Sequence, residues 1–584
     1  MPAEPFPRTR SLELSAPEGA GPPPAGEAAA RTEGAQAIVV DAASLASLEG
    51  APPPPPPQSR PPPIAGQEVT LPRVAWVELA RARSGDEACL DDDANRAGGA
   101  VPVRCPNAPL ARADAASSSG QAARRGDALL LDGLDRWYRL GPTAAGYCAH
   151  CERALNQLLQ QSYGPQLEPF PVLQAQRASG VPPRERPYGG LREQLRLEAP
   201  LAFAKQAILR ARDEARRARA GLELPVLARV GPLSAFSLLL CRHLDGLVFA
   251  LPSLDPFEAL LPLLAARAAL GERPAIAQLP VQARPEQVRL FAALALACGC
   301  DLMLQPGASA EAREALAAHR RYAALLRERY RPGAALGDLE LVLAPRADHW
   351  SQGRHLRASS QVAGVLQRSQ LQTSLALDAP TTGTGSARLI VLCGATELPS
   401  ALATPLRRHV EQGGDLLLVG SCTRIDDEGR PLGPLFPEAK AGLERVAEGR
   451  VYGIAASQGE PLPPLEALEP LVQKALRELL SRAPRSLTMQ GRGQLLARAY
   501  LDPERKLDVH LVNLDLKEGQ GFAAAQGVLL QIAGAAAGAG RTGHWYAPER
   551  AGKDGERITL NPSGFSVSTV LPSIGACALL SVPR

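Results

Sequence analysis

Two acidic residues that lie at or near the ends of short apolar runs are the first candidates for chemistry in this sequence. The run "DALLLDG" (127–133) ends with Asp132, and "RVAWVELA" (73–80) contains Glu78. A carboxylate that follows a buried strand can act as a nucleophile or as a general acid or base. Further acidic candidates of this kind are Asp135 and Asp255.

Both carboxylates also have structural interpretations. Aspartate at a strand end often caps the next segment or hydrogen-bonds a loop, which would account for Asp132. Glu78 can pair with the nearby Arg81 or Arg83. Residue type and position alone leave these alternatives open.

A C-x-x-C pair follows Asp132 in the stretch "YCAHCE", as Cys148 and Cys151. Paired cysteines at this spacing can hold a metal ion or form a redox couple. No thioredoxin-like pattern surrounds them. The remaining cysteines are sparse, and "LALACGC" and "LIVLCG" place several in apolar runs, which predicts buried, reduced thiols.

Aromatic residues make up only 4% of the chain, yet three of them lie close to the two candidate carboxylates. Trp76 precedes Glu78, and Trp137 and Tyr138 follow Asp132. Aromatic faces pack against apolar C–H surfaces, so the three can form a platform for a sugar ring. They can equally belong to an ordinary core.

Eight apolar runs must position these residues. Each has the length of a strand that is buried on both faces. Amphipathic helices are predicted between the later runs, near 192–218, 256–270, 285–297 and 308–330. Eight strands with helical crossovers predict a (β/α)8 TIM-type barrel over residues 1–335. The runs are "RSLELS" (10–15), "AIVVDA" (37–42), "RVAWVELA" (73–80), "DALLLDG" (127–133), "LPVLARV" (224–230), "DGLVFALP" (245–252), "AIAQLP" (275–280) and "DLMLQP" (301–306).

Two further domains and one insertion complete the predicted fold, which is of the α/β class. Residues 336–480 alternate strands and helices, which predicts a small doubly wound, flavodoxin-like α/β domain. Residues 485–584 read as short strands between turns, which predicts a small C-terminal β-sandwich. The insertion "APPPPPPQSRPPP" (51–63) predicts polyproline II or disorder, and we expect it to be removable.

Composition limits the classes of function. Charged residues make up 21% of the chain and the formal net charge is +4, which does not favour a nucleic acid or an acidic membrane as partner. No stretch is long and apolar enough for a transmembrane helix, and the N-terminus lacks the apolar core of a signal peptide. We therefore expect a cytoplasmic protein.

The order of these parts resembles the family-42 glycoside hydrolases, the β-galactosidase type with a trimerisation domain. Five phrases carry the resemblance, and their shared order along the chain makes it more specific than any one of them. They are "VPVRCPNAPLAR" (101–112), "YCAHCERALNQLL" (147–159), "RPEQVRLFAALALACGCDLML" (284–304), "LRRHVEQGGDLLLVG" (406–420) and "DVHLVNLD" (508–515).

The resemblance implies catalytic positions that this sequence has altered. In family-42 enzymes the acid/base is the Glu of an Asn-Glu pair after strand four, and the nucleophile is a Glu after strand seven. Here Asp132 and Gly133 stand at the first position and Gln278 at the second. An amide is a poor nucleophile and does not act as an acid/base. Some related barrels use an aspartate after strand four as nucleophile, so Asp132 keeps that role, with Glu78, Asp135 or Asp255 as partner acid.

The same resemblance implies a structural zinc, because family members often hold one with a cysteine after strand three and a Cys-x-Cys-x-x-Cys loop. Cys105, Cys148 and Cys151 match three ligands, whereas Gly146 stands at the fourth. Zinc prefers four ligands in a structural site. His150 or Cys89 can substitute, or the three thiols are relics.

Together these observations predict a glycoside-hydrolase-like protein that binds or hydrolyses a carbohydrate at the barrel mouth. Trp76, Trp137, Tyr138 and Gln278 would contact the substrate. The alternative is a non-catalytic carbohydrate-binding or assembly protein, which the altered positions favour. By the same resemblance we expect a homo-oligomer, a trimer formed through residues 336–480.

Overall fold

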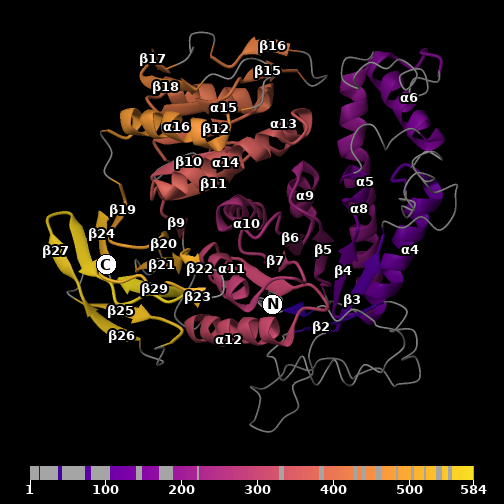
Figure 1. The fold of residues 1–584 in the computed structure, drawn as a ribbon. Helices are drawn as coiled ribbons and strands as arrows, with labels where there is room; N and C mark the ends of the chain where they lie inside the picture. Colours follow the sequence, from indigo (N-terminus) through magenta and orange to yellow (C-terminus); the bar gives the residue numbers. More distant parts are fainter. Residues whose placement is uncertain are drawn as a thin grey trace, which may run out of the picture. The chain divides into compact units, whose positions relative to one another are not determined.

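The structure is a computed structural model. It describes residues 12–13, 37–41, 73–79, 105–139, 148–169, 188–219, 223–327, 334–380, 387–426, 431–436, 442–454, 462–481, 485–501, 506–517, 521–533, 542–549 and 555–582. The proline-rich segment 51–63 lies outside these residues. Figure 1 shows the chain as a ribbon. Its internal contacts divide the chain into two compact units. The first comprises Met1–Gly231, Leu240–Phe249 and Met303–Gly307, and the second comprises Pro232–Leu239, Ala250–Leu302 and Ala308–Arg584.

The first sheet has eight strands in the order in which they occur along the chain. Pairing from β1 through β6 is parallel at every step. Each of the eight predicted runs contains one of these strands, so the predicted TIM-type strand pattern is confirmed. The strands are β1 (Leu12–Glu13), β2 (Ala37–Asp41), β3 (Arg73–Glu78), β4 (Ala128–Asp132), β5 (Val226–Val230), β6 (Gly246–Ala250), β7 (Ala275–Leu279) and β8 (Asp301–Leu304).

Helices connect the strands of this sheet, as a parallel arrangement requires. The four predicted helices are present. Helix α4 was not predicted, because its alanine- and serine-rich sequence has only a weak apolar face. Asp255 caps α10: its Oδ1 accepts a hydrogen bond from the backbone N–H of Phe257. The helices are α4 (Pro109–Arg125), α5 (Arg136–Arg139), α6 (Ala149–Tyr163), α8 (Gly189–Ala218), α9 (Ala235–Leu240), α10 (Pro256–Leu270), α11 (Pro285–Ala297) and α12 (Ala310–Arg327).

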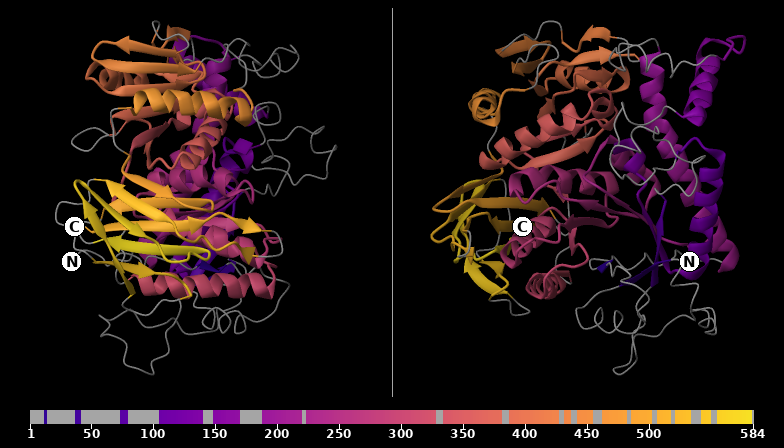
Figure 2. Two further views of the ribbon diagram at one scale, coloured as in Figure 1. Left: turned by 60° about the vertical axis from the view of Figure 1, so that its left-hand side comes forward. Right: turned by 45° about the vertical axis from the view of Figure 1, so that its right-hand side comes forward.

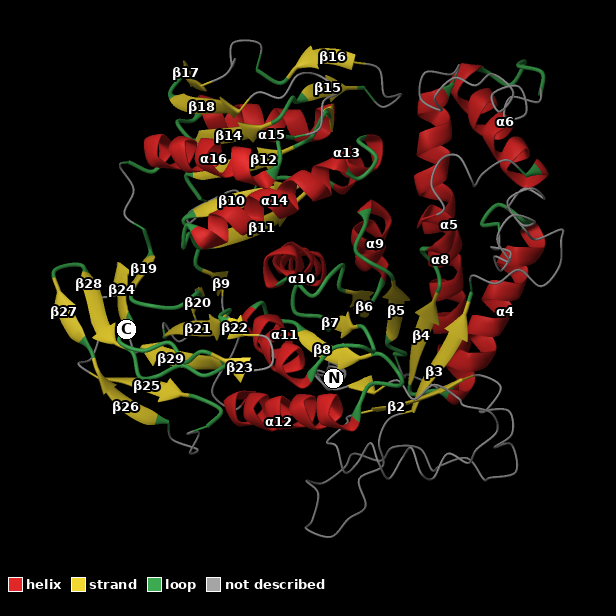
Figure 3. Cartoon of the chain, viewed as in Figure 1, coloured by secondary structure: helices red, strands yellow, loops and turns green. Residues whose placement is uncertain are grey.

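A six-stranded sheet follows in the order β11-β10-β12-β14-β18-β17, parallel except for β17 (Figure 3). Alternate residues of its strands face opposite ways. Leu341 packs in the cluster with α14 and α16, and Val342 packs in the cluster with α13 and α15. Helices therefore cover both faces, as in a doubly wound α/β fold. Its strands are β10 (Leu339–Leu343), β11 (Thr373–Leu377), β12 (Leu389–Cys393), β14 (Asp415–Val419), β17 (Gly442–Val446) and β18 (Gly449–Ile454); the helices are α13 (Pro345–Trp350), α14 (Arg354–Arg368), α15 (Ser400–Glu411) and α16 (Leu465–Leu479). The strands β13 (Glu397–Pro399), β15 (Thr423–Ile425) and β16 (Pro431–Pro434) form a separate small sheet.

The C-terminal domain is a β-sandwich, drawn largely in yellow (Figure 2). One sheet has the order β19-β24-β28-β27 and the other β26-β25-β29-β21-β20-β9, with an apolar core between them that contains Trp545. The order of domain types along the chain confirms the predicted fold class. The strands are β9 (Ala334–Ala335), β19 (Leu487–Gln490), β20 (Leu495–Leu501), β21 (Leu507–Asn513), β24 (Leu529–Ala533), β25 (Thr542–Tyr546), β26 (Glu556–Thr559), β27 (Asn561–Ser563), β28 (Ser566–Val570) and β29 (Cys577–Val582), with β22 (Leu516–Lys517) and β23 (Gly521–Phe522) in a separate hairpin.

The cysteines in apolar runs are buried thiols, as predicted. Cys298, Cys300 and Cys393 are free and buried. Burial raises the pKa of the Cys298 thiol to about 11, so this thiol stays protonated at neutral pH. In the part of the chain that the structure describes, no helix is long and apolar enough to cross a membrane.

Asp348, in α13, is a buried carboxylate that ties together two helix N-termini. Its Oδ1 accepts a hydrogen bond from the backbone N–H of Leu356 at 2.8 Å, and its carboxylate also accepts from that of Ala235. Burial raises the pKa of Asp348 from 3.8 to about 6, against the opposing effects of these bonds and of Arg357. The folded state therefore binds this proton more tightly than the unfolded state does.

We expect the contribution of Asp348 to stability to fall as the pH rises from about 4 to about 6, because the ionised form is disfavoured only in the folded state. The substitution Asp348→Asn removes this titration. Relative to the wild type, the variant should gain stability over that interval, by on the order of 3 kcal/mol. Thermal melting of both proteins from pH 4 to 7 measures the difference, with Asp426→Asn as the control. If the difference in melting temperature between Asp348→Asn and the wild type does not change with pH, the raised pKa of Asp348 is contradicted.

Candidate functional site

Glu78, Asp132 and Arg229 stand side by side at the carboxyl ends of β3, β4 and β5. The register pairs Glu78 with Asp132 and Asp132 with Arg229. Side chains at paired positions of neighbouring strands point to the same face, about 4.8 Å apart. The structure therefore places two of the predicted carboxylates together and adds an arginine that the sequence analysis missed. We call these three residues the strand-end row.

Each carboxylate of the strand-end row is engaged by an arginine. Arg229 Nη1 lies 3.2 Å from Asp132 Oδ2, and Arg136 Nη1 of α5 lies 3.1 Å from Glu78 Oε1. Both pairs are partly exposed to solvent, with the Asp132 side chain at 20% and the Glu78 side chain at 42%. Arg81 and Arg83, the partners suggested for Glu78 by the sequence, lie outside the described residues.

Asp135 is the buried member of the group. Its Oδ2 accepts a hydrogen bond from the backbone N–H of Gly231 at 2.8 Å and lies 2.8 Å from Arg139 Nε. Burial raises the pKa of Asp135, while Arg139 and the Gly231 N–H oppose that rise. These contacts anchor α5 to the backbone just after β5, and they suit a positioning role better than a direct contact with a ligand.

The three aromatic candidates lie near the strand-end row but differ in exposure. Trp137 and Tyr138 in α5 are buried, and the guanidinium of Arg196 stacks on Tyr138, 5.3 Å from its ring centroid. Trp76 is half-buried on β3, two residues before Glu78 and therefore on the same face. Of the three, only Trp76 has exposed surface near the carboxylates, and the positions of Trp137 and Tyr138 favour the core interpretation.

Gln278 and Asp255 lie in other elements. Gln278 is the fourth residue of β7 and is buried. Asp255 is the N-cap of α10 and accepts a hydrogen bond from the backbone N–H of Phe257. The roles predicted for these two residues stay predictions.

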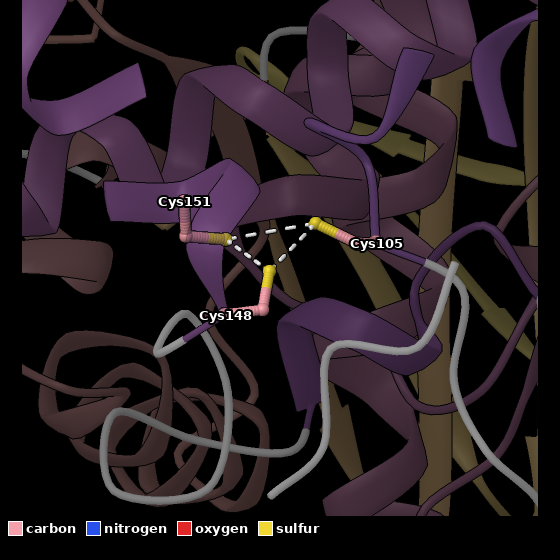
Figure 4. Close-up of side chains that lie close together, drawn as sticks. All are labelled: Cys105, Cys148 and Cys151. Atoms are coloured by element: carbon pink, nitrogen blue, oxygen red, sulfur yellow. Dashed lines mark hydrogen bonds between the residues drawn. The ribbon is translucent and has the colours of Figure 1, made fainter. Parts of the chain in front are cut away.

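The three predicted cysteine ligands meet in one cluster (Figure 4). The sulfur of Cys105 lies 3.4 Å from that of Cys148 and 3.6 Å from that of Cys151, and the last two are 3.6 Å apart. Cys148 immediately precedes the first residue of α6, so one helical turn brings Cys148 and Cys151 together. Asn107 Nδ2 also donates to the Cys151 sulfur at 3.4 Å.

This geometry fits three corners of a tetrahedral zinc site. A Zn–S bond is about 2.3 Å, which sets sulfur atoms about 3.8 Å apart. Among the described residues, no fourth His, Cys, Asp or Glu belongs to the cluster. The half-buried His150 pairs with Arg153 instead, at 2.9 Å, and Cys89 lies outside the described residues. A zinc ion there would join the segment after β3 to the start of α6.

Comparison with known proteins places the fold. No protein-family model matches the chain, and no curated protein matches it. Among solved structures, α-L-fucosidase isoenzyme 2 from Paenibacillus thiaminolyticus is 13% identical, with a TM-score of 0.62 and 96% of each chain covered. The β-galactosidase from Bacillus circulans sp. alkalophilus is 12% identical, with a TM-score of 0.63 over 94% of this chain and 95% of that one.

A catalytic mutant of a GH42 β-galactosidase from G. stearothermophilus is 10% identical, with a TM-score of 0.62 over 95% of this chain and 94% of that one. These likenesses span nearly the whole chain in each case, so its fold is that of the GH42 glycoside hydrolases. The resemblance inferred from short sequence phrases is thereby confirmed at the level of fold. At such low sequence identity, the structural similarity is evidence for the fold alone.

We expect the chain to bind zinc in a 1:1 ratio through Cys105, Cys148 and Cys151. The variant Cys105→Ser should lose the metal and melt at a lower temperature, because removing a structural metal withdraws binding free energy from the folded state. Metal analysis of the purified protein and thermal melting with and without a chelator measure both effects. Cys422→Ser, which changes a cysteine outside the cluster, should keep the metal content and the chelator response of the wild type. The expectation is contradicted if the wild-type protein is isolated without metal and neither zinc nor a chelator changes its melting temperature.

Proposed function

We propose that this protein binds a carbohydrate at the carboxyl ends of β3, β4 and β5. The strand-end row supports the proposal, because two carboxylates and a guanidinium lie side by side at the edge of the sheet where the binding sites of barrels form. Carboxylates accept and guanidinium groups donate hydrogen bonds, so together they match the hydroxyl groups of a sugar. The half-buried Trp76 can pack against the C–H face of the ring.

The fold supports the same class of ligand. The solved structures with this fold include β-galactosidases and an α-L-fucosidase. Since fold does not fix function, the assignment to carbohydrate depends on the fold and the strand-end row together.

Hydrolysis of a glycosidic bond is the second candidate, and the register of β3 with β4 favours it. Paired positions about 4.8 Å apart allow the carboxyl groups of Glu78 and Asp132 to reach the separation of about 5–5.5 Å used by retaining glycosidases. Glu78 would protonate the glycosidic oxygen while Asp132 attacks the anomeric carbon and forms a glycosyl ester. Glu78 would then take a proton from water, and the hydroxide would release the sugar from Asp132.

The ion pairs weigh against hydrolysis. Arg136 Nη1 already contacts Glu78 Oε1, an oxygen of the group that would have to face the glycosidic oxygen. Gln278, at the position implied for the family nucleophile, has an amide in place of a carboxylate. A binding protein that has kept Asp132 for hydrogen bonding accounts for both features, so we place binding first.

A screen of glycan binding and of chromogenic glycosides, run on wild type and Asp132→Asn, separates the two candidates. We expect the wild type to bind a glycan without hydrolysing it and the variant to bind within a few-fold, because the amide still hydrogen-bonds. The variant loses only a partly exposed ion pair, so its stability should change by about 0.2–1 kcal/mol. Asp127→Asn, at the opposite end of β4, is the matched control.

Glycosidase activity that disappears in Asp132→Asn and Glu78→Gln but survives in the control would establish the second candidate. Absence of any glycan binding or hydrolysis by the wild-type protein would refute both. Circular dichroism on each variant checks that the fold is intact.

We also propose that the protein is cytoplasmic and forms a homotrimer through residues 336–480. The trimer proposal is supported by the resemblance of this region to the trimerisation domains of family-42 enzymes. We expect three times the chain mass of 61.5 kDa by light scattering at micromolar concentration. A chain that stays monomeric under these conditions would contradict the proposal.

A further inference from the structure

The outer face of the sheet β19-β24-β28-β27 in the C-terminal sandwich is a flat grid of side chains. Along these strands alternate residues are buried in the sandwich core, including Leu530, Ile532 and Val567, and the residues between them face outward. The register aligns the outward residues across the strands. The rows are Gln490-Leu529-Val570, Thr488-Gln531-Ser568-Asn561 and Ala533-Ser566-Ser563. We call these rows the outer grid.

The outer grid is rich in amides and hydroxyls. The strand sequences LTMQ, LLQIA, SVSTV and NPS contain no Asp, Glu, Lys or Arg, although 21% of the chain is charged. Charged side chains on edge strands commonly discourage unwanted pairing, and the outer strands β19 and β27 of this sheet carry none. A solvent-facing sheet without them is therefore suited to an uncharged ligand.

Apolar surface is concentrated at two places around these rows. Phe565, in the turn between β27 and β28, is 88% exposed, and Val570 at the other end of β28 is 62% exposed. Gly564, with a φ of 58°, makes the turn that presents Phe565. An aromatic ring at one end and aliphatic carbon at the other give an extended ligand two apolar contacts, with polar rows between them.

Hydrogen bonds within the outer grid hold its polar groups in place. Gln531 Nε2 donates to Ser566 Oγ at 3.3 Å, and Ser566 Oγ donates to the Ser563 carbonyl at 3.0 Å. Ser568 Oγ donates to the Asn561 carbonyl at 3.4 Å. The hydroxyl oxygens keep the capacity to accept further bonds. Groups already ordered in this way lose little conformational entropy when a ligand binds.

We propose that the outer grid is a second binding surface for a neutral glycan chain, separate from the strand-end row. Amides and hydroxyls match sugar hydroxyls, Phe565 can stack on the C–H face of a sugar ring, and the absence of charge on the four strands selects against an anionic polymer. A second copy of the chain is a poorer match, because protein interfaces have apolar cores and the middle row here is entirely polar. The choice of a glycan over another neutral polymer rests on the proposed function.

Affinity electrophoresis of the full chain tests this proposal, in native gels with and without a soluble neutral β-galactan. We expect the galactan to retard the wild type, and Phe565→Ala and Gln531→Ala each to weaken the retardation about threefold or more. Both residues are exposed, so the variants should keep the wild-type melting temperature. Leu110→Ala, at an exposed apolar position in α4, is the matched control and should migrate as the wild type.

The double variant Glu78→Ala/Asp132→Ala, which removes both carboxylates of the strand-end row, separates this surface from that row in the same gels. We expect it to be retarded nearly as strongly as the wild type, which would support the outer grid even if the strand-end row binds nothing. Retardation that the double variant abolishes and Phe565→Ala leaves unchanged would overturn the proposal while supporting the strand-end site. The proposal would also be overturned if the galactan did not retard the wild type, or if only a sulfated galactan did. It would likewise be overturned if Phe565→Asp changed the oligomeric state without changing the retardation.

Discussion

The parallel register of β3, β4 and β5 is the constraint on which the candidate site depends. Hydrogen bonding between the strands aligns their carboxyl ends, and the pleat then turns Glu78, Asp132 and Arg229 to the same face. Three residues separated by long stretches of sequence become neighbours through backbone pairing alone. A slip of one residue in β4 would turn Asp132 to the opposite face, so the register determines the chemistry of this edge.

Charge pairing decides what this edge can do. Arg136 and Arg229 engage the two carboxylates, and the buried Asp135 anchors Arg139 and the backbone of Gly231. Such pairing lowers the free energy of exposed charges only slightly, but it orients their oxygens. The result is a polar edge suited to hydrogen-bonding a ligand, in which an arginine already engages an oxygen of each carboxylate.

The cysteine cluster and the outer grid show how local geometry adds to a widely shared fold. One helical turn brings Cys148 and Cys151 together, and Cys105 completes the cluster from the segment after β3. The outer grid arises from alternation along four antiparallel strands. Both lie outside the strand-end row, and each presents a different chemistry: thiolates for a soft metal ion, and amides with hydroxyls for a neutral chain.

The sequence by itself determined the eight strands of the first sheet, the domain types and the cysteine pair, because short apolar runs and the C-x-x-C spacing are local signals. It also identified Asp132 and Glu78 as residues near strand ends. Only the tertiary structure decided that they are adjacent, that Arg229 and Arg136 engage them, and that Trp137 and Tyr138 are buried. Arginine is frequent along this sequence, so nothing local distinguishes Arg229. Pairing and burial are relations between distant segments, which only the folded sheet creates.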